Sequence, residues 1–532
     1  MAEAAVAHRS ARDKMDAKPA PTAILVFLVV LCGGLIFTAY SIWSDVSATG
    51  DPLTFLPFLL LGIALLIALA FEFVNGFHDT ANAVATVIYT HSLPPHFAVV
   101  WSGMWNFLGV LFSSGAVAFS IVSLLPVELI LNVGSGAGMS MVFALLIAAI
   151  IWNLGTWFFG LPASSSHTLI GSIIGVGVAN QLMNGAGGTS GVDWGQAANI
   201  GYSLLLSPII GFAASALLLL SLKVLIRNPE LYREPKGHKP PPSWIRGLLI
   251  LTCTGVSFAH GSNDGQKGMG LIMLILIGIV PTTYALNRAV DAQDVNQFRA
   301  VTTATIDSLQ AYTNGVAAPA NAHDSLLAYI RDKKLAPDTV PALIVVSDQI
   351  SKQVASLSSL SQVPAAAVQN VRNDMYLTTE TIRLMLKAKN PAFDAATVTN
   401  LRAMEKGLDK ATKYIPLWVK VSVAIALGLG TMIGWKRIVV TVGEKIGKSH
   451  LTYAQGASAE VVAMLTIGAA DVFGLPVSTT HVLSSGVAGT MAANKSGLQM
   501  STVRNLILAW VLTLPAAIVL SALLYYFFHS VM

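Results

Sequence analysis

A nine-residue segment rich in hydroxyl groups occurs twice in this chain of 532 residues. Residues 159–167 read FGLPASSSH and residues 473–481 read FGLPVSTTH, and both copies lie inside long apolar stretches. Glycine permits a turn there, and proline suits the first position of a new helix. The residues directly after each proline would then form a helix N-terminus, whose free N–H groups attract anions. We expect an oxyanion site made by Ser164, Ser165, Ser166, Ser478, Thr479 and Thr480.

A second pair of polar motifs precedes these segments. GFHDTAN covers residues 76–82 and GSNDGQK covers residues 261–267. Both motifs hold glycine and small residues that permit a helix to unwind. Ionisable residues inside a membrane are rare and usually functional, so Asp79 and Asp264 are candidates to bind a cation or to carry a proton. A structural hydrogen bond to exposed backbone is the alternative role for each.

Four further residues are placed to support these groups. Glu72 lies seven residues before Asp79, hence on the same face of a helix, and Asn75 lies between them. His167 and His481 directly follow the two hydroxyl clusters. Each histidine could donate to a bound anion or orient the turn, and the sequence leaves both roles open.

The elements that position these motifs are transmembrane helices. Hydrophobic residues make up 54% of the chain and charged residues 11%, against about 25% charged in an ordinary soluble domain. Basic residues collect at the ends of apolar stretches, so the net charge of +5 reports membrane orientation and no nucleic-acid partner. The expected spans are 22–43, 55–92, 97–125, 139–159, 163–183, 199–226, 245–284, 415–434, 455–473, 476–493 and 502–528.

The spacing of the motifs predicts two related halves. Asp79 lies 83 residues before Pro162, whereas Asp264 lies 212 residues before Pro476. The difference of 129 is almost the length of the segment 285–414, so each half has the same internal spacing once that segment is removed. Each half then holds five spans, and an odd number of crossings places the two repeats in opposite membrane orientations.

The expected fold is therefore an all-α polytopic membrane protein with two inverted repeats and re-entrant helical hairpins. Lysine and arginine in the N-terminal tail and in two later loops place these segments in the cytoplasm, and the segment 285–414 and the C-terminus in the periplasm. The parts are a cytoplasmic tail (1–21), an extra transmembrane helix and loop (22–54), a first repeat (55–226), a basic cytoplasmic loop (227–244), the start of a second repeat (245–284), a helical insertion (285–414) and the rest of the second repeat (415–532).

Several classes of function are disfavoured by the same residues. An intramembrane hydrolase would need one activated nucleophile with a base and an orienting acid, and it has no reason to duplicate its serine cluster. No Walker-type glycine loop occurs, so transport driven by ATP on this chain is not expected. We expect a secondary transporter without a cofactor, and a membrane sensor that binds its anion without accumulating it remains the alternative outside transport.

The chain resembles the inorganic phosphate transporter (PiT) family at four segments: GFHDTANAVATVIYT, IIWNLGTWFFGLPASSSHTLIG, SFAHGSNDGQKGMGLIMLILIG and FGLPVSTTHVLSSGVAGTM. The resemblance covers nearly all of 55–284 and 415–532. It implies a dimeric symporter that takes up phosphate across the bacterial inner membrane. In this family phosphate is held between two hairpins, here around Ser164–Ser166 and Ser478–Thr480, and the duplicated aspartates belong to the coupling-cation machinery. The resemblance further implies a neutral complex of phosphate with a divalent metal (Mg, Ca or Zn) as the cargo, and arsenate as a second substrate.

The acidic motifs depart from the sodium-coupled members of this family. Those members resemble an N-D-x-x-N pattern in both copies, with oxygen ligands suited to a hard cation. Here the copies read H-D-T-A-N and N-D-G-Q-K, so His78 replaces one amide and Lys267 replaces another. An ammonium at this position would repel sodium and itself neutralise Asp264. Asn106 also stands where sodium-coupled members look to have a glutamate.

These departures favour proton coupling, with Lys267 in the place of a bound cation. Sodium–phosphate symport remains the alternative, and sulfate transport is a further one, because hydroxyls and helix ends distinguish tetrahedral anions weakly. The metal that accompanies phosphate is not determined by the sequence. The candidate coupling residues are His78, Asp79, Asn82, Asn263, Asp264 and Lys267.

Overall fold

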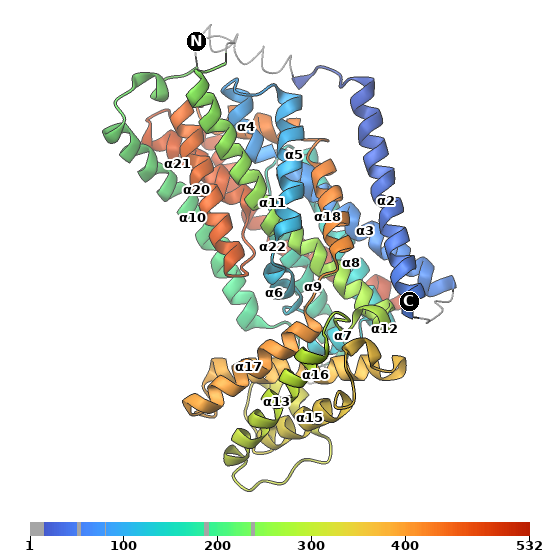
Figure 1. Cartoon of the computed structure of the whole chain (residues 1–532). Coiled ribbons are helices and arrows are strands. Elements are labelled where there is room, and N and C mark those ends of the chain that lie inside the picture. Colours follow the sequence, from blue (N-terminus) through green and yellow to red (C-terminus); the bar gives the residue numbers. More distant parts are fainter. Residues whose placement is uncertain (1–14, 50–54, 80, 186–190, 236–239, 532) are drawn as a thin grey trace.

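The computed structural model describes residues 15–49, 55–79, 81–185, 191–235 and 240–531, except for the side chains of Ala81 and Asn82. Every regular element in this part of the chain is helical, which confirms the all-α fold (Figure 1). The helices outside the insertion are α2 (Pro21–Thr49), α3 (Phe55–Asp79), α4 (Ala81–Tyr89), α5 (Pro95–Phe112), α6 (Ala116–Val122), α7 (Val127–Leu131), α8 (Gly136–Phe158), α9 (Ser165–Asn184), α10 (Trp194–Leu225), α11 (Ser243–Ile279), α18 (Leu417–Gly430), α19 (Lys436–Val440), α20 (Tyr453–Val472), α21 (Thr479–Ala493) and α22 (Met500–Val531).

The chain is a multi-pass membrane protein. Five described helices are long and apolar enough to cross a bilayer, namely α2, α3 with α4, α8, α10 and α22. The number rises to seven if two bent pairs, α5 with α6 and α17 with α18, each count as one span. Each of the eleven expected stretches contains helix. The number of helices that are long and apolar enough to cross a bilayer is nevertheless lower than eleven. The reason is that several stretches fold as shorter or more polar helices, including those that carry the duplicated motifs.

Two helical hairpins carry the duplicated segments. The first consists of α8 and α9 and the second of α20 and α21, and the two helices of each hairpin pack against one another. The chain turns between them at Gly160 and Gly474, whose φ angles are +65° and +64°. Side chains other than glycine rarely adopt this left-handed conformation, so the matched glycines set the matched turns.

The second helix of each hairpin, α9 or α21, begins later than the sequence predicts. Proline was expected at the first helical position, but α9 begins three residues after Pro162 and α21 begins three residues after Pro476. The physical reason is capping: Ser164 accepts a hydrogen bond from the N–H of His167, and Ser478 accepts the equivalent bond in the second hairpin. A serine hydroxyl satisfies an otherwise unpaired N–H of the first turn, which proline cannot do.

Contacts between the halves come in matched pairs. Helix α10 of the first half packs against α21 of the second, and α22 of the second packs against α9 of the first. In the same way α5 packs against α11, and α18 packs against α3. The α9–α22 approach is close enough that a Cβ on Gly175 would lie 2.2 Å from the carbonyl oxygen of Ile518. The reciprocal packing fits a repeat, while the inverted orientation stays a prediction.

The segments expected in the cytoplasm meet at one end of the molecule. The N–H of His450, after the second basic loop, donates to Glu234 of the first basic loop at 3.0 Å. Lys436 contacts Asp16 of the N-terminal tail. The insertion and the end of α22 lie at the opposite end (Figure 1). The side of the membrane that each end faces stays a prediction.

The insertion is a helical unit with its own hydrophobic core, as expected. Its core includes Leu326, Leu343 and Leu401. It contacts the membrane helices through apolar residues such as Val127 and Ile277. It also contacts them through an ion pair of 2.7 Å between Lys333 and Asp193, the residue that caps α10. The short helix α12 (Pro281–Tyr284) directly precedes it. Its own α-helices are α13 (Ala292–Leu309), α14 (Ala322–Asp332), α15 (Thr339–Gln353), α16 (Ala365–Ala388) and α17 (Ala395–Thr412).

Candidate functional site

The two hairpins meet at their hydroxyl clusters. The Ser166 hydroxyl on α9 donates to the backbone oxygen of Val477, next to the start of α21, at 2.7 Å. All six predicted hydroxyl residues are at most 5% exposed. The two helix N-termini, each with its capping serine, therefore converge on one buried region, as an anion site shared between two halves requires.

Asp79 lies between the two hairpins, at the end of α3. It accepts hydrogen bonds from Ser165 of the first hairpin and, at 2.7 Å, from Thr480 of the second. The Nδ1 atom of His78 lies 2.9 Å from the same carboxylate, and its Nε2 atom lies 3.1 Å from the Thr156 hydroxyl on α8. His78 therefore orients Asp79 against the first hairpin, and one carboxylate is tied to both hydroxyl clusters.

The predicted supporting residues extend this network along α3. The Ser165 hydroxyl also lies 2.7 Å from the side-chain oxygen of Asn75, and the amide of Asn75 lies 3.4 Å from Glu72. Both residues are fully buried. Glu72 and Asn75 thus lie on one face of α3, as their spacing predicts, and Asn75 connects Glu72 to the first hydroxyl cluster.

Lys267 forms a buried ion pair in the second motif. Its ammonium lies 2.7 Å from a carboxylate oxygen of Asp264 and 2.5 Å from the Ser166 hydroxyl, and both charged side chains have no exposed area. Loss of one partner from a buried pair leaves an uncompensated charge and typically costs about 3–5 kcal/mol. The ammonium therefore occupies the position beside Asp264 where a bound cation would otherwise compensate the carboxylate.

The glycines of the second motif do not unwind its helix. Helix α11 runs unbroken from Ser243 to Ile279 through Asp264. The glycines of this motif instead permit close packing: a Cβ on Gly265 would lie 2.5 Å from Val110, and one on Gly268 would lie 2.3 Å from Glu72. Small residues in a membrane helix permit either outcome, and here the neighbouring helices select packing.

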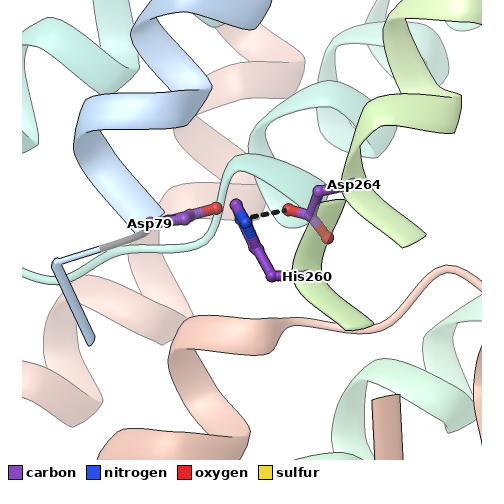
Figure 2. A group of neighbouring side chains, drawn as sticks. All are labelled: Asp79, His260 and Asp264. Atoms are coloured by element: carbon purple, nitrogen blue, oxygen red, sulfur yellow. Dashed lines mark ion pairs between the residues drawn. The ribbon is translucent and has the colours of Figure 1, made fainter. Parts of the chain in front are cut away.

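His260 joins the two aspartates, and the sequence interpretation did not include it. Ligand atoms of Asp79, His260 and Asp264 all lie within 4.8 Å of one another (Figure 2). One ring nitrogen of His260 lies 3.5 Å from Asp264 and the other lies 3.0 Å from the side-chain oxygen of Asn106. His260 precedes Asp264 by four residues on the same helix, a spacing that could have revealed it. Two carboxylates and an imidazole can hold a cation.

The histidines of the duplicated segments lie against each other. The ring centroids of His167 and His481 are 4.6 Å apart, and His481 stacks on Trp510 of α22 at 4.2 Å. The indole N–H of Trp510 donates to the carbonyl oxygen of Pro162 at 3.0 Å. The His167 Nδ1 and His481 Nε2 atoms have no hydrogen-bond partner among the described residues. The stacked rings orient both turns. Because these two ring nitrogens are unpaired among the described residues, donation of a hydrogen bond to an anion also stays a prediction.

Of the two asparagines predicted in the acidic motifs, only Asn263 has a side chain among the described residues. Asn263 donates to the carbonyl oxygen of Leu475 at 3.1 Å and accepts from the N–H of Val477 at 3.5 Å, so its amide holds the turn of the second hairpin. The side chain of Asn82 lies outside the described residues. The coupling roles of both stay predictions.

A family model described as "Phosphate transporter family" matches residues 75–521, a range that contains both acidic motifs and both hairpins. The chain belongs to this phosphate transporter family. Its members are transporters, which excludes the enzymatic alternative.

Two relatives in this family come from Escherichia coli (strain K12). Low-affinity inorganic phosphate transporter PitA is 43% identical over 489 residues, which cover 88% of this chain and 96% of PitA. PitB is 42% identical over 485 residues, with the same shares covered. A solved structure described as the sodium-dependent phosphate transporter is 19% identical, with 89% of this chain and all of that chain covered and a TM-score of 0.48.

Proposed function

We propose that this phosphate transporter family member is a secondary active symporter that imports inorganic phosphate. The observation that carries the proposal is the meeting of two buried helix N-termini with six hydroxyl residues, where Ser166 contacts Val477. Backbone N–H groups and hydroxyls at helix N-termini are donors for a tetrahedral oxyanion. The names of PitA and PitB as low-affinity inorganic phosphate transporters support phosphate as the anion.

The coupling ion in this proposal is the proton. Asp79 and Lys267 each share a hydroxyl with the anion site, through Thr480 and Ser166 respectively. A phosphate that takes over these hydroxyls changes the contacts of both charged groups, so anion binding and their protonation are linked. Lys267 already compensates Asp264, so this carboxylate does not need a sodium ion for charge compensation.

The proposed cargo is phosphate together with a divalent metal. The carboxylates of Asp79 and Asp264 and the imidazole of His260 converge beside the hydroxyls. Carboxylate oxygens suit Mg²⁺ and Ca²⁺, and an imidazole extends the set to Zn²⁺. A metal held there would be carried as substrate with phosphate, since its positive charge neutralises the anion. Arsenate, which has the same shape and charge, is expected to compete.

The remaining architectural predictions belong to the same proposal. The reciprocal packing of α9 with α22 and of α10 with α21 supports two repeats related by inversion. The contact between the two basic loops supports a cytoplasmic location for that end. The insertion and the C-terminus would then face the periplasm of a bacterial inner membrane, in a homodimer.

Uptake of radiolabelled phosphate into proteoliposomes tests this proposal when sodium, the pH gradient and magnesium are varied independently. We expect accumulation driven by an acidic exterior without sodium, stimulation by Mg²⁺, strong competition by arsenate and weak competition by sulfate. Strict dependence on sodium with no response to a pH gradient would reject proton coupling. Phosphate binding without accumulation would reject transport in favour of a sensor, and competition by sulfate equal to that by arsenate would reject phosphate selectivity.

A further inference from the structure

A large cavity lies between the insertion and the membrane helices. It has a volume of about 960 Å³ and extends from α16 and α17 to Gly474 and Leu475 at the turn of the second hairpin. Pockets that hold small ligands have volumes of about 300–1,000 Å³. Neutral hydrogen-bonding side chains on its wall include Ser120, Ser123, Gln196 and Asn199.

Arg372 of α16 contributes a buried positive charge to this cavity. It is 6% exposed and is the only buried arginine among the described residues. Its guanidinium donates to the carbonyl oxygen of Ile130 and to the side chain of Asn373, each at 3.2 Å, and lies over the ring of Tyr376. All of these partners are uncharged. Arginine keeps its charge in proteins, so a buried guanidinium requires charge compensation that this part of the chain does not supply.

The other cations of the cavity wall are already compensated. Arg383 pairs with Glu380, with Glu405 at 3.2 Å and with Asp409 at 3.5 Å. Although burial opposes it, these carboxylates raise the pKa of Arg383 above its ordinary value. Burial instead lowers the pKa of Arg372, against a small opposing effect of Tyr376. Lys410 and Lys413 of the same wall pair with Asp294 and Asp409.

We propose that Arg372 forms a second anion site, at which an oxyanion is captured beneath the insertion before it reaches the buried hydroxyls. Arginine presents five N–H donors in a planar fork that matches the oxygens of phosphate. The cavity leads from this guanidinium to the second hairpin turn, shortly before the capping residue of α21. The insertion is thus part of the transport route. The capture of an anion is independent of the proposed function, whereas phosphate as that anion rests on it.

A single cysteine on the cavity wall can report both charge and occupancy. Ser123→Cys is introduced into a full-length chain in which Cys32 and Cys253 are replaced by alanine. The labelling rates of a negatively and a positively charged methanethiosulfonate reagent are compared, with and without inorganic phosphate. We expect the negative reagent to react faster, and inorganic phosphate to slow both reactions. Arg372→Gln should lower the ratio of the two rates by about fivefold or more, as loss of one nearby charge at an intermediate dielectric requires.

Two further variants separate capture of an anion from a structural role of Arg372. Arg372→Lys keeps the charge and should keep most of the rate ratio, whereas Arg402→Gln removes an exposed arginine outside the cavity and should change nothing. A rate ratio that Arg372→Gln leaves unchanged, or no protection by phosphate in the Ser123→Cys chain, would overturn the proposal. The second result does not depend on folding of any Arg372 variant. Labelling that behaves as expected in a chain without phosphate uptake would reject the proposed function and leave the anion site standing.

Discussion

The two acidic motifs occupy equivalent positions in the sequence but have different surroundings. Asp79 accepts hydrogen bonds from hydroxyls of both hairpins. Asp264 instead pairs with Lys267, three residues along the same helix. The two hairpins are therefore similar, whereas the two acidic motifs are specialised.

This difference teaches how an anion site and a coupling site can share atoms. The third hydroxyl of each cluster crosses to the opposite half: Thr480 donates to Asp79, and Ser166 receives a hydrogen bond from Lys267. One half thus presents a carboxylate to the proposed anion site and the other presents an ammonium. Under the proposed proton coupling, these groups of opposite charge would give proton transfer a direction that two identical motifs would lack.

Loss of the Asp79 charge should have the largest effect on this arrangement. Asp79→Asn keeps the shape but weakens two charge-assisted hydrogen bonds, each worth about 1.5–3 kcal/mol. We expect phosphate uptake into proteoliposomes to fall by about 100-fold or more, since the hydrogen bonds that join this residue to both hairpins are weakened. Asp291→Asn, at the start of α13, is the control because aspartate and asparagine cap helices equally well. Uptake above a tenth of the wild-type rate in Asp79→Asn would contradict the assigned role.

Lys267 should be nearly as critical, but its loss can be compensated. Lys267→Met leaves Asp264 buried without a partner, and we expect a loss of about 3–5 kcal/mol of stability in detergent thermal unfolding. The double variant Lys267→Met with Asp264→Asn removes both charges and should recover most of that stability. It should nevertheless lose the response of uptake to a pH gradient. Equal stability of the single and double variants would show that the ion pair contributes nothing.

The fold was largely accessible from the sequence because its signals are local. Apolar stretches predicted helices, and two copies of one segment predicted two hairpins. The start of α9 at Ser165 was missed by a few residues, because capping by Ser164 competes with the preference of proline for the first turn. The unbroken course of α11 agrees with the expected span 245–284. The close packing of its glycines was not predicted, because glycine spacing is the same for an unwound helix and for a closely packed one.

The site was accessible only in part because its contacts are distant in sequence. The six hydroxyls and the two aspartates were predicted from the duplicated motifs alone. The bond from Thr480 to Asp79 joins residues 401 positions apart, and no single-sequence pattern contains it. Trp510 and Arg372 carry no local signal, since only packing places them against His481 and the cavity. His260 had a signal, its spacing of four from Asp264, that was not used.

A change in the Asp79–His260–Asp264 cluster should have an intermediate effect, on the metal dependence of phosphate uptake. His260→Gln removes the imidazole and should raise the Mg²⁺ or Zn²⁺ concentration that half-stimulates phosphate uptake by about tenfold, a change typical even of lost outer partners of a metal. His323→Gln is the matched control, because this histidine also lies beside a carboxylate, that of Asp374 at 2.6 Å, but in the insertion. An unchanged metal dependence in His260→Gln would place the metal elsewhere.

Two adjacent threonines sharpen the comparison further. Thr480 donates to Asp79, whereas the Thr479 hydroxyl is buried without a hydrogen-bond partner among the described residues. Thr480→Val should cost about 1.5–3 kcal/mol of stability, the range for a bond to a charged group. Thr479→Val should leave stability unchanged or raise it, yet weaken phosphate binding, because its hydroxyl is available to the anion. Thermal unfolding with and without phosphate measures both, and equal losses for the two variants would contradict this division.

The smallest expected effect concerns one polar contact between the insertion and the first half. Asp193 caps α10 of the first half and pairs with Lys333 of the insertion. Burial opposes its ionisation, but the Lys333 hydrogen bond and the N–H groups of Gln196 and Gly195 outweigh it and lower the pKa of Asp193. A lowered folded-state pKa means that this stability is present above the unfolded-state pKa and is lost as pH falls through the folded-state pKa.

Asp193→Asn tests this attachment because asparagine keeps the cap and loses the ion pair. The pair is partly exposed, so solvent screening limits its contribution to about 0.5–1 kcal/mol. We expect the wild-type chain to be the more stable by this amount in thermal unfolding near neutral pH. The difference should shrink towards zero as the pH falls below the ordinary aspartate value of about 3.9. A difference that is constant with pH would mean that Asp193 stabilises α10 through its shape and not through its charge.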